Sequence, residues 1–137
     1  MKILFSFLLL INLSLPSSNL SGDAECLKNK YKGTWKNNSI YITISDASFN
    51  NFLAYSGKLS GFTQFKNNIC PLSGTFKLID KGTYSVSMGE TGSEKYCNAW
   101  FYGSFICYSD RTEFYGEIET SGEYAPKREE LNMTSKY

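Results

Sequence analysis

The chain has 137 residues, of which 42% are hydrophobic and 16% aromatic, and it contains no histidine. Its 14 basic and 13 acidic residues nearly balance, which argues against a nucleic-acid-binding protein with a strongly basic surface. The absence of histidine removes the commonest general base and every Ser-His-Asp or Cys-His catalytic arrangement. We therefore expect a protein that is not an enzyme and has no nucleic-acid partner.

Residues 1–24 have the pattern of a secretory signal peptide. Lys2 is followed by an apolar run over residues 3–15, which is shorter than the roughly 20 residues needed to span a bilayer. The small residues Gly22 and Ala24 place the cleavage after Ala24, and a cut near Ser18 is the alternative. We expect residues 25–137 to form one domain, exported without a membrane anchor, that is extracellular or, in a bacterium, periplasmic.

A recurring pair, a glycine and a large apolar residue two positions later, predicts strands. Residues two apart share one face of a strand, and the glycine leaves space there for a neighbouring ring or backbone. Alternating runs such as Ile40, Ile42 and Ile44 support the same interpretation. The pair occurs at Gly33/Trp35, Gly57/Leu59, Gly74/Phe76, Gly82/Tyr84, Gly103/Phe105, Gly116/Ile118 and Gly122/Tyr124.

The predicted elements are six to eight strands joined by short turns. Asp80-Lys81-Gly82 is expected to form a tight hairpin, and Ser109–Thr112 a second reversal. After Pro126 the sequence could begin one short helix, followed by a frayed tail. This order predicts an all-β fold, either a small antiparallel barrel, which the glycines favour, or a β-sandwich. The strands are expected near 34–44, 52–59, 62–66, 72–79, 83–88, 96–108 and 112–119.

Four cysteines in a small exported domain predict two disulfides. If the strands alternate in direction as expected, Cys26 and Cys107 lie at one end of the fold, and Cys70 and Cys97 lie at the other. The predicted pairs are therefore Cys26–Cys107 and Cys70–Cys97. If residues 52–66 form a single strand, the later directions reverse and Cys26–Cys70 becomes an alternative. No CxxC pair or metal-ligand pattern occurs, so we expect neither a metal nor another cofactor.

Two Asn-x-Ser/Thr sequons begin at Asn37 and Asn132. Both are candidate glycosylation sites in a eukaryotic secretory pathway. The acidic residues that gather toward the end of the chain are interpreted as a solvated strand face. A calcium site is the alternative, although the usual ligand loop is absent.

The segment Gly33-Thr34-Trp35-Lys36-Asn37 on the first predicted strand resembles the start of the calycin barrels, the lipocalins and avidins. The resemblance implies a β-barrel in which Trp35 closes one end. In the avidin form it also implies that Asn37 contacts the ligand.

The many aromatic residues suggest a binding function. We expect a small apolar or amphipathic ligand in a barrel mouth near Trp35, Tyr55, Tyr84 and Trp100. The alternative is an extracellular interaction factor or inhibitor that meets a protein partner through its loops. The mouth is expected to include Tyr41, Phe76 and Phe114, and the alternative would use loops at 46–51, 66–68 and 89–95.

Overall fold

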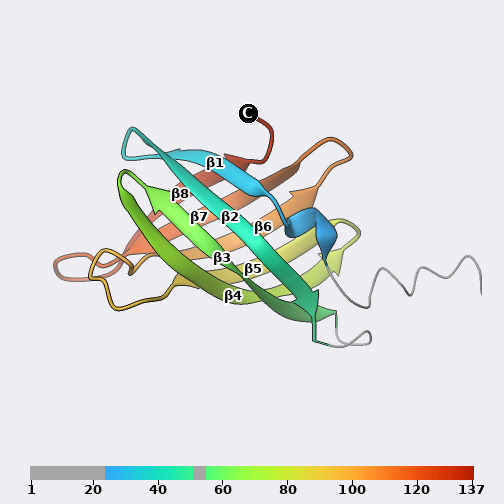
Figure 1. Cartoon of the computed structure of the whole chain (residues 1–137), viewed down its shortest axis with the longest axis horizontal. Helices are drawn as coiled ribbons and strands as arrows, with labels where there is room; N and C mark the ends of the chain where they lie inside the picture. The colour runs from blue at the N-terminus through green and yellow to red at the C-terminus, as the bar shows by residue number, and fades with distance from the viewer. Residues whose placement is uncertain (1–23, 51–54) are drawn as a thin grey trace, which may run out of the picture.

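Eight antiparallel strands, each paired with its neighbours along the chain, close into a barrel (Figure 1). The computed structural model describes residues 24–50 and 55–137, so the predicted signal peptide lies outside the described residues except for Ala24. The all-β barrel predicted from the sequence is confirmed. The strands are β1 (Lys30–Trp35), β2 (Asn38–Phe49), β3 (Ser56–Phe65), β4 (Asn68–Asp80), β5 (Thr83–Glu90), β6 (Trp100–Cys107), β7 (Thr112–Thr120) and β8 (Lys127–Thr134).

Aromatic rings fill the barrel interior. One cluster joins Phe49, Phe76 and Tyr84, with centroids 5.3 Å apart between the first two rings and 5.6 Å between the last two. A second cluster joins Phe105 to Phe114 and to Tyr31, at 5.2 and 4.8 Å. Inward residues alternate with outward ones along each strand, as period-two patterning requires. The interior is therefore a core of packed side chains, as is usual for an eight-stranded barrel.

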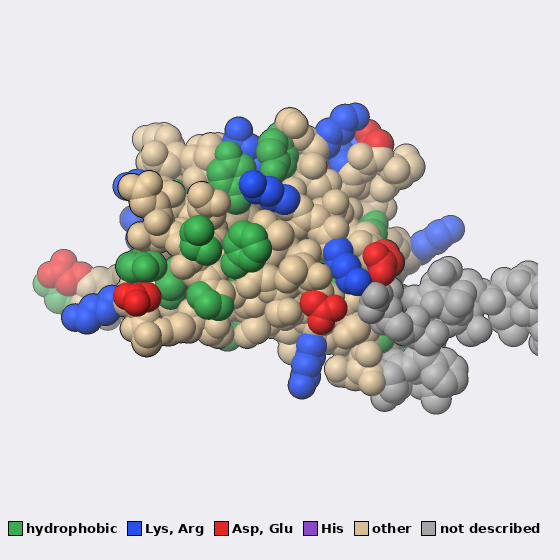
Figure 2. Space-filling view, viewed as in Figure 1, with side chains coloured by type: hydrophobic (Ala, Val, Ile, Leu, Met, Phe, Trp, Pro, Cys, Tyr) green, Lys and Arg blue, Asp and Glu red, His purple; other side chains and the backbone are tan. Residues whose placement is uncertain are grey.

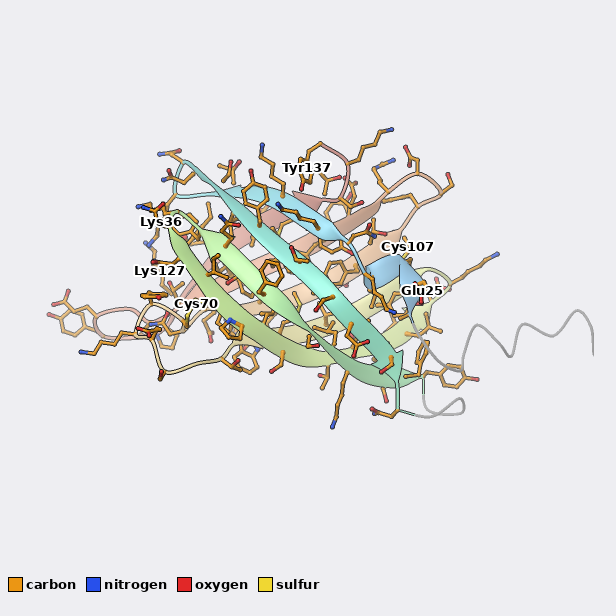
Figure 3. All side chains as sticks on the ribbon, in the orientation of Figure 1. Glu25, Lys36, Cys70, Cys107, Lys127 and Tyr137 are labelled. Atoms are coloured by element: carbon orange, nitrogen blue, oxygen red, sulfur yellow. A yellow bond between two sulfur atoms is a disulfide. The ribbon has the colours of Figure 1, made fainter. Side chains whose placement is uncertain are left out.

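Each end of the barrel carries a cover that a disulfide ties down. At one end, the short 3-10 helix η2 (Glu25–Leu27) buries Leu27 completely, and Cys26 bonds Cys107 at the end of β6. At the other end, Cys70 in β4 bonds Cys97 in the segment between β5 and β6. Figure 3 shows Cys70 and Cys107 at opposite ends of the barrel. Both predicted pairings are confirmed.

Two details of the predicted strand order differ from the structure and compensate for each other. The predicted first strand is two strands, because the chain reverses at Lys36 and Asn37, where φ is positive at 50° and 62°. The predicted strands 52–59 and 62–66 are one strand, β3. One extra reversal and one missing reversal leave every direction from β4 onward as expected. That is why a single strand over residues 56–65 does not lead to the alternative Cys26–Cys70 bond.

The C-terminal segment also differs from the expectation of a short helix and a frayed tail. Residues 127–134 form β8, which pairs with β7 along its length and with β1 at two positions. Leu131 and Met133 are both buried, so this segment follows the two-residue period of a strand. Figure 1 shows the first strand beside the last, where the barrel closes. In the described residues, no helix has the length and apolar character needed to cross a membrane.

Candidate binding site on the outer face

The outer face of the barrel carries a hollow of about 640 Å³ over β2 to β6. Its lining is rich in hydroxyl groups and has one large aromatic side chain, Trp100, at its edge. Where Figure 2 shows the outer face over β2 to β4, most of the surface is neither hydrophobic nor charged. The lining residues are Asp46, Ser48, Lys58, Leu59, Ser60, Ser73, Gly74, Thr75, Ser87 and Trp100.

Strand register explains why these side chains meet. One row of directly opposed positions runs across five strands, Asp46–Ser60–Ser73–Gly89–Trp100. The adjacent outward row runs Ser48–Lys58–Thr75–Ser87–Tyr102. Neighbouring strands lie about 4.8 Å apart, so the first row spans about 19 Å from Asp46 to Trp100. The hollow forms because the small side chains in both rows extend only a short distance from the sheet.

Trp100 is held flat against the sheet at the edge of the hollow. It lies directly opposite Gly89 on β5, and a Cβ at position 89 would overlap the indole ring. The indole Nε1 donates a hydrogen bond to Ser87 Oγ over 2.9 Å, which fixes the rotation of the ring. Trp100 remains 40% exposed. A fixed aromatic surface next to hydroxyl groups can stack on a ligand while those groups bond to its polar atoms.

The hollow has balanced charges. Asp46 and Lys58 are its acidic and basic side chains, and within residues 24–50 and 55–137 no ion pair joins either of them to another side chain. Both are therefore available to a ligand. In the same described residues, no group of three or more Cys, Asp or Glu side chains is arranged to hold a metal ion.

Trp35, unlike Trp100, does not lie in the outer hollow. It lies at a narrow mouth of the barrel. Its ring is 4.7 Å from that of Phe65, and its Nε1 donates a hydrogen bond to a Glu129 carboxylate oxygen. Two hydrogen bonds lower the pKa of Glu129 from its ordinary value. The bond from Trp35 has the larger effect, and the bond from Lys127 has the next largest. The mouth cavity beside Trp35 has a volume of about 60 Å³, whereas small-molecule pockets usually occupy roughly 300–1,000 Å³.

The five residues expected to bind a ligand do not share one site. Asn37 lies in the exposed turn between β1 and β2, and Tyr55 precedes β3 with 52% of its surface exposed. Tyr84 is buried inside the barrel, where burial raises its pKa. Only Trp100 lies in the outer hollow. Of the other residues expected near the mouth, Phe76 and Phe114 belong to the interior, and Tyr41 lies on the outer face of β2 against Tyr137.

The serine and threonine residues of the hollow were not identified from the sequence. Each stands at an outward position of a strand, which a two-residue alternation shows, but their meeting depends on register between five strands. Both predicted glycosylation sites are exposed. Asn132 lies on the outer side of β8, where its side chain donates a hydrogen bond to Glu130 over 3.1 Å.

No protein-family model, curated protein or solved structure matches this chain.

Proposed function

We propose that this protein is a secreted, non-catalytic binding protein that holds a small amphipathic ligand in the outer hollow beside Trp100. The observation that supports this most is the exposed indole ring, held in place at the edge of a hollow of about 640 Å³ with a hydroxyl-rich floor. That volume lies within the range of small-molecule sites. Two disulfides agree with an oxidising compartment outside the cytoplasm.

The outer hollow suits a ligand better than the barrel interior does. The interior is occupied by packed rings, and the mouth beside Trp35 offers about 60 Å³. A purely apolar ligand on the outer face would separate the serine hydroxyls from water without replacing their hydrogen bonds, which is unfavourable. The ligand should therefore carry both an apolar surface and polar groups.

The experiment labels the protein with 5-fluorotryptophan, which gives one ¹⁹F resonance for each of the two tryptophans. The Trp100→Ala variant assigns the two signals. We expect ligands from a small-molecule screen to shift the Trp100 resonance and to leave that of Trp35 in place. A ligand that shifts only Trp35 would place binding at the mouth and contradict the outer site.

A matched pair of variants tests the location. Ser73→Arg puts a large side chain on the floor of the hollow, whereas Thr34→Arg makes the same kind of change at an exposed position of β1. Binding should be lost in the first and kept in the second. Equal behaviour of the two variants would contradict the proposal.

A second candidate function is an extracellular interaction factor that acts through a loop. The residues from Thr91 to Tyr96 are all exposed, and the Cys70–Cys97 disulfide anchors the segment that carries them. An anchored loop loses little conformational freedom when it meets a partner. Substitution of Glu94 and Tyr96 by alanine should then abolish capture of a specific protein from extracellular fluid. If the double variant still captures the protein, the loop is not the surface that binds the partner.

A further inference from the structure

The outer hollow combines two kinds of surface that one class of ligand needs together. Along its floor, Ser60, Ser73 and Thr75 present hydroxyl groups, each of which can donate one hydrogen bond and accept two. At its edge, Trp100 presents a ring that carries partial negative charge on its face. A pyranose sugar has hydroxyl groups around its ring and weakly positive C–H groups on one face. Its two surfaces complement those of the hollow.

The charge and the length of the hollow restrict the class of ligand further. The lining contains one acidic and one basic side chain, Asp46 and Lys58, so it offers no net attraction to a polyanion such as a nucleic acid. The row from Asp46 to Trp100 crosses four strand spacings, about 19 Å, which exceeds the size of a single sugar ring. We propose, resting on the function proposed above, that the hollow binds a neutral oligosaccharide, with one sugar stacked on Trp100 and the following sugars over the serine row.

Gly89 is the positioning residue of this site. Because any side chain at position 89 would overlap the indole, the glycine is what allows Trp100 to lie parallel to the sheet. In Gly89→Ala the colliding atoms belong to a side chain that can move, so the barrel should still form while the ring tilts away. The variant therefore separates the orientation of the ring from its chemical identity, since it removes none of the side chains that would touch the sugar and changes only how the Trp100 ring lies.

The test is an array of neutral oligosaccharides, followed by calorimetric titration of each variant with the tightest binder and by ¹⁹F detection of Trp100 in the proteins that retain it. We expect binding to weaken about tenfold or more in Trp100→Ala, equivalent to at least about 1.4 kcal/mol. Gly89→Ala should weaken binding as well, with an unchanged melting temperature for unfolding of the barrel. Tyr108→Ala is the matched control, because Tyr108 is 42% exposed and lies beyond the far end of β6. It should bind like the wild type.

A parallel titration with 2-naphthylmethanol, a neutral amphipathic probe that has an aromatic surface and a hydroxyl group but no sugar ring, distinguishes two kinds of failure. If no neutral oligosaccharide on the array binds, but the probe shifts the Trp100 resonance, the carbohydrate inference is overturned and binding at the hollow stands. If neither the oligosaccharides nor the probe affects Trp100, both the inference and the proposed site are overturned. Binding of oligosaccharides that is unchanged in both Trp100→Ala and Gly89→Ala would also overturn the inference.

Discussion

Tyr31 shows how one polar atom is accommodated inside the barrel. The residue is completely buried, and its hydroxyl donates a hydrogen bond to the backbone oxygen of Leu27 over 2.7 Å. Burial raises the pKa of this phenol well above its ordinary value, so the hydroxyl remains protonated and continues to donate. The bond joins β1 to η2, which covers the end of the barrel where the Cys26–Cys107 disulfide lies. A single hydroxyl thus links the core to its cover.

Replacement of Tyr31 by phenylalanine should reduce the free energy of unfolding by about 0.5–1.5 kcal/mol, because the Leu27 carbonyl loses one of its two donors and keeps only the Asn29 backbone N–H. Urea unfolding measures the change. Tyr115→Phe is the control, since its hydroxyl bonds to Glu113 on the exposed face, and it should change the stability by less than 1 kcal/mol or so. Equal losses in the two variants would contradict the role assigned to Tyr31.

Glu129 gives a pH-dependent signal at the barrel mouth. Its pKa is lowered from 4.5, chiefly by the hydrogen bond from Trp35. A lowered pKa in the folded state means that the stabilisation is present above pH 4.5 and is lost as the pH falls through the lower folded value. The Trp35 indole N–H resonance should therefore titrate with a midpoint below 4.5. Glu129→Gln should remove this transition, and a midpoint at or above 4.5 in the wild type would disprove the interaction.

At the scale of elements, the cover formed by η2 depends on Ala24, the residue that precedes the predicted cleavage point. Ala24 is buried, and its backbone N–H donates to the oxygen of Ala47 over 2.9 Å. Its own oxygen accepts from Leu27 over 3.1 Å. Cleavage after Ala24 removes these contacts, whereas cleavage near Ser18 keeps them. The position of the cut thus affects how firmly η2 is held.

A protein beginning at Glu25 should be less stable than one beginning at Asp23 by about 1–3 kcal/mol, from the loss of these hydrogen bonds and the buried methyl group. Chemical denaturation of the two purified forms measures the difference. Mass spectrometry of the protein purified from its natural source then shows which form occurs. Identical denaturation midpoints would mean that Ala24 contributes nothing to the cover.

The two disulfides should contribute unequally. They join residues separated by 81 positions for Cys26–Cys107 and 27 positions for Cys70–Cys97. The chain-entropy relation gives about 4.5 and 3.6 kcal/mol respectively, against a total stability of about 5–15 kcal/mol for a domain. Replacing Cys26 and Cys107 together by alanine should therefore lower the melting temperature more than replacing Cys70 and Cys97. The reverse order would contradict this account, and each double variant is the control for the other.

The strands were more predictable than the turns between them. Alternation marks inward residues such as Ile40 and Ile42 directly, because burial on one face imposes it. The reversal at Lys36 and Asn37 lacks glycine and proline, but Asn37 tolerates the positive φ that the turn requires, and this signal was missed. The strand expected from Tyr96 onward begins only at Trp100, and residues 91–99 form no strand. The disulfide pairs were correct because the two errors in strand number cancelled.

At the scale of the whole molecule, a filled interior and two covered ends leave the outer surface as the place for recognition. The sequence identified Trp100 as a candidate but placed it with residues that lie elsewhere. Alternation shows that a serine points outward, but it does not show which serine on the next strand stands beside it. That relation depends on the bulge between Ile44 and Asp46 and on the turns that set each register. The site is thus a property of the assembled sheet.

Closure of the barrel joins β1, the first strand along the chain, to β8, the last, through only the pairs Lys32–Thr134 and Gly33–Met133. About 100 residues separate these partners, so their pairing loses more chain entropy than most other contacts and should form late in folding. Until β8 has paired, β1 and β7 present unpaired edges, and the chain is then most exposed to aggregation. In the finished protein, amide hydrogens at this junction should exchange before those of β3 and β4. Hydrogen–deuterium exchange resolved by residue would show this order of opening.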